Sequence, residues 1–186
     1  MAMRVIAGTA KGRHLKLVPG EGTRPIMDRV KEALFNILGQ NIRGATFLDL
    51  YAGTGSVGIE ALSRGAERAV FVENSRAAIS TIEENLKIAG LADKATIVRR
   101  DVRDYLRQPN PAAFEYVYIA PPQYKDLWRD TLVLLDGHPA HLQPDAVVVV
   151  QIDPREKQEI TLTNLVPFDE RRYGKTLLWF FEHPGE

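Results

Sequence analysis

The regular alternation of short apolar runs with helical segments, from residue 46 onward, most constrains how this chain can fold. Buried strands are typically short apolar runs, whereas helices repeat apolar residues every three or four positions. The expected strands are 46–50, 69–72, 95–98, 116–119 and 146–151, and the expected helices are 60–63, 76–89, 104–106 and 126–135. Strands that alternate with helices favour a doubly wound parallel sheet, which is an α/β fold of the Rossmann-like type.

The two ends of the chain depart from this alternation. Residues 165–173 and 175–181 predict an antiparallel strand pair, which would complete a mostly parallel sheet of seven strands with a C-terminal hairpin. Residues 4–8 and 13–18 predict a small hairpin at the start of the chain, with Gly12 in its turn. We expect an N-terminal hairpin extension over 1–22 and a Rossmann-like domain over 23–186.

A glycine-rich loop follows the first strand of the alternation. Residues 53–58 match the pattern Gly-x-Gly-x-x-Gly, which typically binds a dinucleotide at the start of a helix. Glu73 ends the next strand, at a position where an acid can bind ribose hydroxyls. Because NAD and S-adenosylmethionine (SAM) both contain adenosine, the loop and Glu73 fit either cofactor.

Asp49, near the end of the strand that precedes the loop, helps to choose between these cofactors. A carboxylate there would repel the anionic pyrophosphate of a dinucleotide. It would attract the sulfonium and α-ammonium groups of SAM, by roughly 4 kcal/mol at ~4 Å and an effective dielectric of about 20. Asp49 could instead cap the following turn, but a role in binding SAM is the favoured interpretation.

Asp101 ends the third strand of the alternation, so it should lie at the same sheet edge as the glycine loop. A carboxylate there can accept a hydrogen bond from an adenine amino group. Alternatively, Asp101 neutralises the neighbouring Arg99, Arg100 and Arg103. We favour a cofactor role, because several strand ends bring unusual residues to this one edge.

The fourth strand runs into an unusual turn, Ala120-Pro121-Pro122-Gln123-Tyr124. Its two prolines fix the backbone and remove two N–H donors, which leaves carbonyl oxygens free to accept hydrogen bonds. Pro121 and Gln123 can then accept hydrogens of an exocyclic base amine, and Tyr124 can stack on an extruded base. The alternative is a rigid turn with a packing tyrosine, and the glycine loop opposite favours base binding.

Composition removes several classes of function. The chain has no cysteine, which excludes disulfides, thiolate nucleophiles and cysteine-bound metals. His138 and His141 lie in an expected loop and are interpreted as solvated side chains rather than metal ligands. No apolar run is long enough for a membrane span, and the first residues contain no signal-like segment. We therefore expect a soluble, cytoplasmic protein without a metal site.

The charge of the chain is unevenly distributed. Its net charge is zero, yet residues 1–31 contain seven basic residues and two acidic ones. A basic N-terminal arm either binds nucleic-acid phosphates or is an ordinary solvated hairpin. Charge alone leaves these two alternatives evenly matched.

Taken together, these segments resemble the RsmD-like family of small-subunit ribosomal RNA guanine-N2 methyltransferases. The resemblance covers nearly the whole chain. It is carried by residues 4–8, 11–13, 23–25, 29–35, 48–55, 58–66, 72–73 and 173–176. These segments together are far more specific than the glycine loop alone.

The resemblance implies a methyltransferase that uses SAM and methylates a guanine amine of ribosomal RNA, free or in the assembling small subunit. We also expect a monomer. The implied cofactor-binding residues are Asp49, Tyr51, Gly53, Gly55, Glu73, Asp101 and Val102. The candidate catalytic residues are Pro121, Gln123 and Tyr124, and the candidate RNA-binding residues are Arg4, Lys11, Arg13, Arg24 and Arg29.

One position departs from the pattern of the wider group of amino-methylating enzymes, which carry Asp or Asn before Pro-Pro-Tyr. Here that position is Ala120, and Gln123 is inserted before Tyr124. A non-catalytic SAM- or RNA-binding module therefore competes with the enzyme hypothesis, and DNA competes with RNA as the substrate. An NAD-dependent oxidoreductase is a further alternative, although no Tyr-x-x-x-Lys proton donor is evident.

Overall fold

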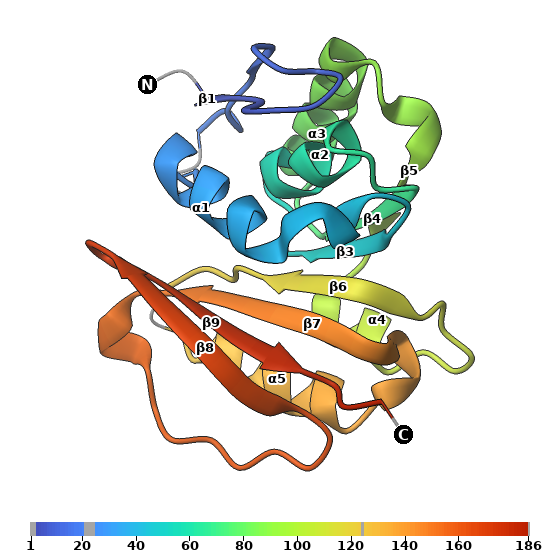
Figure 1. The fold of residues 1–186 in the computed structure, drawn as a ribbon. Helices are drawn as coiled ribbons and strands as arrows, with labels where there is room; N and C mark the ends of the chain where they lie inside the picture. The colour runs from blue at the N-terminus through green and yellow to red at the C-terminus, as the bar shows by residue number, and fades with distance from the viewer. Residues whose placement is uncertain (1–2, 21–24, 124, 186) are drawn as a thin grey trace.

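The computed structural model describes residues 3–20, 25–123 and 125–185, and Figure 1 shows helices packed around a twisted central sheet. Its strands are β1 (Met3–Arg4), β2 (His14–Leu15), β3 (Thr46–Leu50), β4 (Arg68–Glu73), β5 (Ala95–Arg99), β6 (Phe114–Ile119), β7 (Leu142–Ile152), β8 (Val166–Tyr173) and β9 (Thr176–Glu182). Its α-helices are α1 (Asp28–Leu38), α2 (Ser56–Ser63), α3 (Arg76–Ala89), α4 (Val102–Leu106) and α5 (Leu127–Asp136). Short 3-10 helices are η1 (Gly39–Ile42), η2 (Ala92–Lys94), η3 (Pro139–His141) and η4 (Pro154–Glu156).

The large sheet has seven strands in the order β5-β4-β3-β6-β7-β9-β8. Strands β3 to β7 pair in parallel, and β9 is antiparallel to both β7 and β8. This confirms the expected sheet with its C-terminal hairpin. The chain runs outward from β3 to β5 and then returns to β6 on the other side of β3, and ligands of such sheets bind at the carboxyl ends of the strands beside this point.

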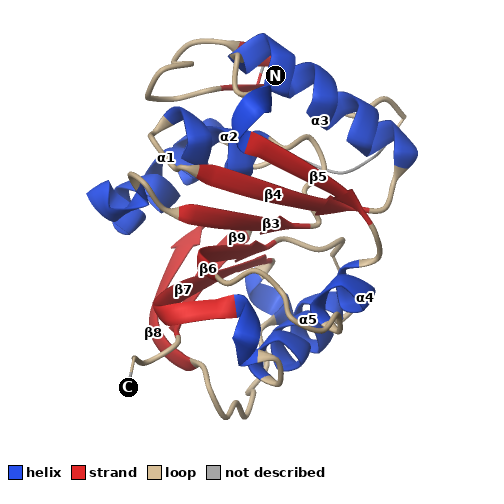
Figure 2. Cartoon of the chain, turned by 90° about the vertical axis from the view of Figure 1, so that its right-hand side faces the viewer, coloured by secondary structure: helices blue, strands red, loops and turns tan. Residues whose placement is uncertain are grey.

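Helices cover both faces of the sheet, as Figure 2 shows. Helices α1, α2 and α3 pack on one face, and α4 and α5 pack on the other. The central strands can be covered twice because their side chains are apolar on both faces. Phe47 and Phe71 belong to the first core, whereas Leu48 and Val72 belong to the second. Two cores thus support the sheet edge that carries the loops.

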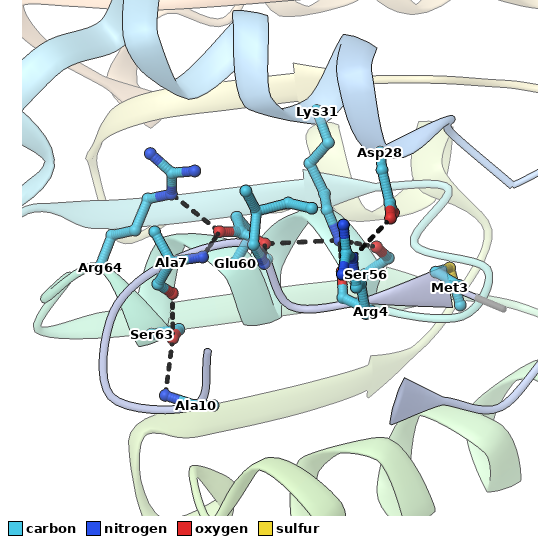
Figure 3. A network of polar contacts seen from close by, with 12 residues as sticks. Met3, Arg4, Ala7, Ala10, Asp28, Lys31, Ser56, Glu60, Ser63 and Arg64 are labelled. Carbon is cyan, nitrogen blue, oxygen red and sulfur yellow. Dashed lines mark hydrogen bonds and ion pairs between the residues drawn. The ribbon is translucent and has the colours of Figure 1, made fainter. Parts of the chain in front are cut away.

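The N-terminal hairpin is smaller than expected. Strands β1 and β2 contain two residues each, whereas the sequence predicts strands over 4–8 and 13–18. The physical reason is Glu60 on α2, whose carboxylate accepts the backbone N–H groups of Ile6 at 2.9 Å and Ala7 at 3.1 Å. Figure 3 shows Ala7 and Glu60 facing one another. These donors are turned toward a helix instead of toward a partner strand.

A buried ion cluster lies beside this segment (Figure 3). Lys31 Nζ lies 3.4 Å from the Glu60 carboxylate, both side chains are fully buried, and Arg64 bonds to the same carboxylate at 2.8 Å. Lys31 also donates to the Arg4 carbonyl at 2.7 Å and to the Ser56 hydroxyl at 2.9 Å. Burial lowers the pKa of Lys31, and the attraction of Glu60 opposes that shift. Lys31 therefore belongs to the core and not to an exposed basic arm.

His141 is fully buried, so the expectation that both loop histidines are solvated was wrong. Its Nε2 lies 2.8 Å from the Leu106 carbonyl, and its ring lies 5.6 Å from that of Tyr105. Burial lowers the pKa of His141. Exposure was expected from the composition of the loop around His141. That composition could not show that α4 covers this side chain.

Candidate functional site

A cavity of about 790 Å³ opens at the carboxyl ends of β3, β4 and β6, the edge at which the sequence predicts the site. Most of the predicted residues line it: Asp49, Tyr51, Gly53, Glu73, Asp101, Val102, Pro121 and Gln123. Two other predicted residues, Arg24 and Tyr124, lie outside the described residues. The cavity is thus shared by the loop expected to bind a cofactor and the turn expected to bind a base.

The glycine loop joins β3 to α2 in a tight path. Gly55 adopts a φ of 79° just before α2, in the left-handed region that glycine tolerates best. Gly58, inside α2, has no room for a side chain, because a Cβ there would lie 2.4 Å from the Phe71 ring. Glycine at this position therefore lets α2 pack closely on the sheet and brings the start of the helix to the cavity.

Asp49 lies beneath this loop and is 1% exposed. Its Oδ2 accepts a hydrogen bond from the Gly58 N–H at 3.0 Å, which is the turn-stabilising contact considered as the alternative role. Asp49 also lines the cavity, so both roles are sterically open to it. Burial raises the pKa of Asp49 well above its usual 3.8, the Gly58 hydrogen bond opposes the shift, and nearby Glu73 adds to it.

Glu73 ends β4 and anchors the glycine loop. Its Oε1 accepts the Gly53 N–H at 2.9 Å, and its Oε2 accepts the N–H groups of Asn74 and Ser75, each at 2.8 Å. A carboxylate offers about four lone-pair sites, so one further hydrogen bond can still form. Glu73 therefore holds the loop in position and keeps some capacity for a hydroxyl in the cavity.

Asp101 follows β5 and caps α4. Its carboxylate accepts the Arg103 N–H at 2.8 Å and pairs with the Arg103 guanidinium at 3.1 Å. The hydrogen bond from the Arg103 side chain is the main reason that the pKa of Asp101 is lowered. Arg103 is thus the neighbour that Asp101 pairs with, while one side of Asp101 still faces the cavity.

Tyr118 and Gln151 are among the cavity residues that the sequence analysis missed. Tyr118 on β6 donates its hydroxyl to the side-chain oxygen of Gln151 near the end of β7, and both line the cavity. Burial, with a smaller contribution from Asp49, raises the pKa of Tyr118 well above 10.0, so this phenol stays protonated. Tyr118 precedes Ala120 by two residues, and side chains two residues apart lie on the same face of a strand. This spacing could have predicted that Tyr118 points to the same side as Ala120. Gln151 could have been noticed as the polar end of an apolar run.

Those predicted RNA-binding residues that the structure describes lie in two places, Arg4 and Arg29 near the start of α1 and Lys11 and Arg13 in another loop. Arg4 pairs with Asp28 at 3.0 Å. Lys11 and Arg13 belong to a loop that lies beside Ser63, the last residue of α2. The first residue of α2, Ser56, lines the cavity, and the eight-residue helix separates its two ends by about 12 Å. Arg29 is exposed near the start of α1. The structure therefore does not bring Lys11 and Arg13 to the cavity.

The described ranges contain no group of three or more His, Asp or Glu side chains arranged to hold a metal ion. Within the same ranges, every helix is too short or too polar to cross a membrane.

The whole chain is similar to curated bacterial proteins. The family model described as Conserved hypothetical protein 95 matches residues 3–182. A Bacillus subtilis protein, YlbH, described as a candidate rRNA methyltransferase, is 37% identical over 98% of this chain and 100% of its own length. The Haemophilus influenzae ribosomal RNA small subunit methyltransferase D is 35% identical over 92% of this chain and 89% of its own length.

Solved structures share the fold. The Escherichia coli protein yhhF, described as a candidate methyltransferase, superposes with a TM-score of 0.88 at 30% identity and covers 100% of both chains. An RNA methyltransferase from Salinibacter ruber, solved in complex with S-adenosyl-L-homocysteine, has a TM-score of 0.66 at 18% identity and covers 88% of this chain and 95% of its own. The second likeness shows the fold alone.

Proposed function

Because the chain belongs to the family described as Conserved hypothetical protein 95, we propose that it is a SAM-dependent methyltransferase of ribosomal RNA. Its product in this proposal is guanine methylated on N2 in the small-subunit RNA, either free or in the assembling particle. We further propose that it acts as a cytoplasmic monomer and needs no metal.

The observation that carries this proposal is that three carboxylates and a proline-rich turn line one cavity. Asp49, Glu73 and Asp101 are among its lining residues, as are Pro121 and Gln123. Three acids disfavour an anionic pyrophosphate and suit a cation with free ribose hydroxyls. Asp49 would favour the cationic groups of SAM, Glu73 the ribose and Asp101 the adenine amine. The donor set therefore fits SAM better than NAD.

An exocyclic base amine needs help because its lone pair is delocalised into the ring. Bound in this cavity, SAM would supply an electrophilic methyl group to that nitrogen and leave as a neutral thioether, and the amine would lose one proton. The carbonyl of Pro121 and the amide oxygen of Gln123 can accept amine hydrogens and orient the nitrogen. Because Ala120 has no side-chain acceptor, the Pro121 carbonyl and the Gln123 amide oxygen accept the hydrogen bonds of the amine in its place.

Calorimetry and methyl transfer test the proposal together. The expected result is binding of SAM but not of NAD, and transfer of a tritiated methyl group to small-subunit ribosomal RNA or particles that lack the modification. Tight SAM binding without transfer to free RNA or to particles would contradict the proposal and favour a non-catalytic module. Transfer to DNA instead of RNA would contradict the proposed substrate.

A further inference from the structure

The tip of the β8–β9 hairpin lies at the same sheet edge as the cavity. Strand β9 is antiparallel to β7, with Ile152 opposite Leu177, and the turn closes where Tyr173 meets Thr176. Gln151, which precedes Ile152, lines the cavity. The turn at residues 174–175 is therefore next to the part of the cavity that holds the proline-rich turn.

This tip meets the beginning of α1. A Cβ on Gly174 would lie 3.9 Å from the Arg29 guanidinium, so two segments more than a hundred residues apart touch here. Pro25 and Ile26, just before α1, line the cavity. Figure 1 shows the hairpin tip and the start of α1 on the same side of the molecule. Arg29 and the hairpin tip thus lie beside residues that line the cavity, and we call this side of the cavity its entrance.

The entrance is positively charged. Arg29, Arg172 and Lys175 are exposed, and we call these three residues the hairpin rim. Within the described ranges, no ion pair involves any of them, and Arg172 donates only to the Gly174 carbonyl. Three acids close to the rim in sequence are already paired: Asp28 with Arg4, Asp169 with Arg171, and Glu170 with Lys157. Glu32, three residues after Arg29 on α1, is exposed and forms no ion pair within the described ranges. The charges of the rim are therefore not held in ion pairs and are accessible to a ligand.

We propose that the hairpin rim binds RNA backbone phosphates next to the target nucleotide and so positions the strand over the cavity. This inference rests on the proposed RNA substrate. Arginine offers a planar fork to phosphate oxygens and lysine a compact charge, and both release counterions from the nucleic acid. Two of the basic residues expected from sequence to do this lie elsewhere: Lys11 is exposed in the loop that contacts Ser63 at the end of α2, and Arg13 donates to the Ile88 carbonyl near the end of α3.

Two matched double variants separate these surfaces. Arg29→Ala with Lys175→Ala removes two rim charges, and Lys11→Ala with Arg13→Ala removes two charges at the other edge. Binding of transcribed small-subunit ribosomal RNA is measured over a salt series. The rim variant should bind at least about 10-fold more weakly and lower the slope of log affinity against log salt by about 1 to 2, whereas the other variant should keep the wild-type slope. A charge-preserving variant, Arg29→Lys with Lys175→Arg, should also keep it.

Unchanged SAM affinity, measured by calorimetry, confirms that each variant is folded. If the rim variant keeps the wild-type slope and RNA affinity, the proposed role of the hairpin rim is wrong. It is also wrong if only the Lys11 and Arg13 variant loses RNA affinity. Methyl transfer by the wild-type protein to the same RNA is measured separately. If the wild-type protein transfers methyl groups and the rim variant binds RNA normally, only the proposed role of the rim is wrong. If the wild-type protein transfers no methyl group, both the proposed function and the role of the rim are wrong.

Discussion

At the scale of single residues, the acids at the strand ends combine a structural and a ligand-facing role. The sequence was sufficient to predict that Asp49, Glu73 and Asp101 share one edge, because the ends of parallel strands always meet there. It could not predict their partners, since the N–H groups of Gly58 and Gly53 come into reach only when the loop folds. The same limit applies to the contact of Tyr118 with Gln151: the strand period could have placed Tyr118 on the cavity face, but its partner lies on a strand that is distant in sequence.

Asp49 yields a prediction about pH. Its pKa is raised in the folded protein by burial, so the folded chain holds a proton that the unfolded chain releases above about 3.8. Asp49 therefore contributes stability at low pH that is lost as the pH rises through its folded pKa. The ionised form is the one that attracts a cation, so SAM affinity should rise with pH over that same window.

Replacement of Asp49 by Asn should weaken SAM binding by about 10-fold or more at neutral pH and remove this pH dependence. Calorimetry across a pH series measures both effects. Asp104→Asn, on the exposed surface of α4, is the matched control and should behave like the wild type. Equal affinity of Asp49→Asn and wild type at every pH would remove Asp49 from the cofactor site.

At the scale of elements, prediction succeeded where local signals decide the ends. Helix α3 begins and ends at the predicted residues, because the Ser75 hydroxyl caps its start and Gly90 adopts the left-handed conformation at its end. The N-terminal strands were predicted too long, because Glu60, more than fifty residues away, takes the N–H groups of Ile6 and Ala7. A contact at that separation leaves no trace in the local pattern.

Glu60 also yields a stability prediction. Glu60→Gln leaves the buried Lys31 without its counter-charge, and the loss of one partner of a buried pair should lower the free energy of unfolding by about 3 kcal/mol or more. Urea denaturation measures the change. Glu83→Gln, exposed on α3, should stay within about 0.5 kcal/mol of the wild type. Lys31→Met combined with Glu60→Gln should lose less than the sum of the single changes, and full additivity would contradict the pairing.

At the scale of the whole molecule, the alternation of strands and helices was enough to predict a doubly wound sheet and the edge that carries the site. It could not show that the C-terminal hairpin comes close to α1, because the two segments are more than a hundred residues apart in the sequence. The basic residues were accordingly assigned to an N-terminal arm, whereas the structure separates them into a buried lysine, a distant loop and the rim of the cavity.

The central claim is that this cavity transfers a methyl group from SAM to the N2 amine of a guanine in small-subunit ribosomal RNA. Its most direct test is nucleoside analysis, by mass spectrometry, of that RNA after incubation with the protein and SAM. The account predicts one new N2-methylguanosine in the wild-type reaction and slower formation of the same product by Asp49→Asn when SAM is limiting. A methylated nucleoside of any other base, or unmodified RNA from a protein that binds SAM, would contradict it.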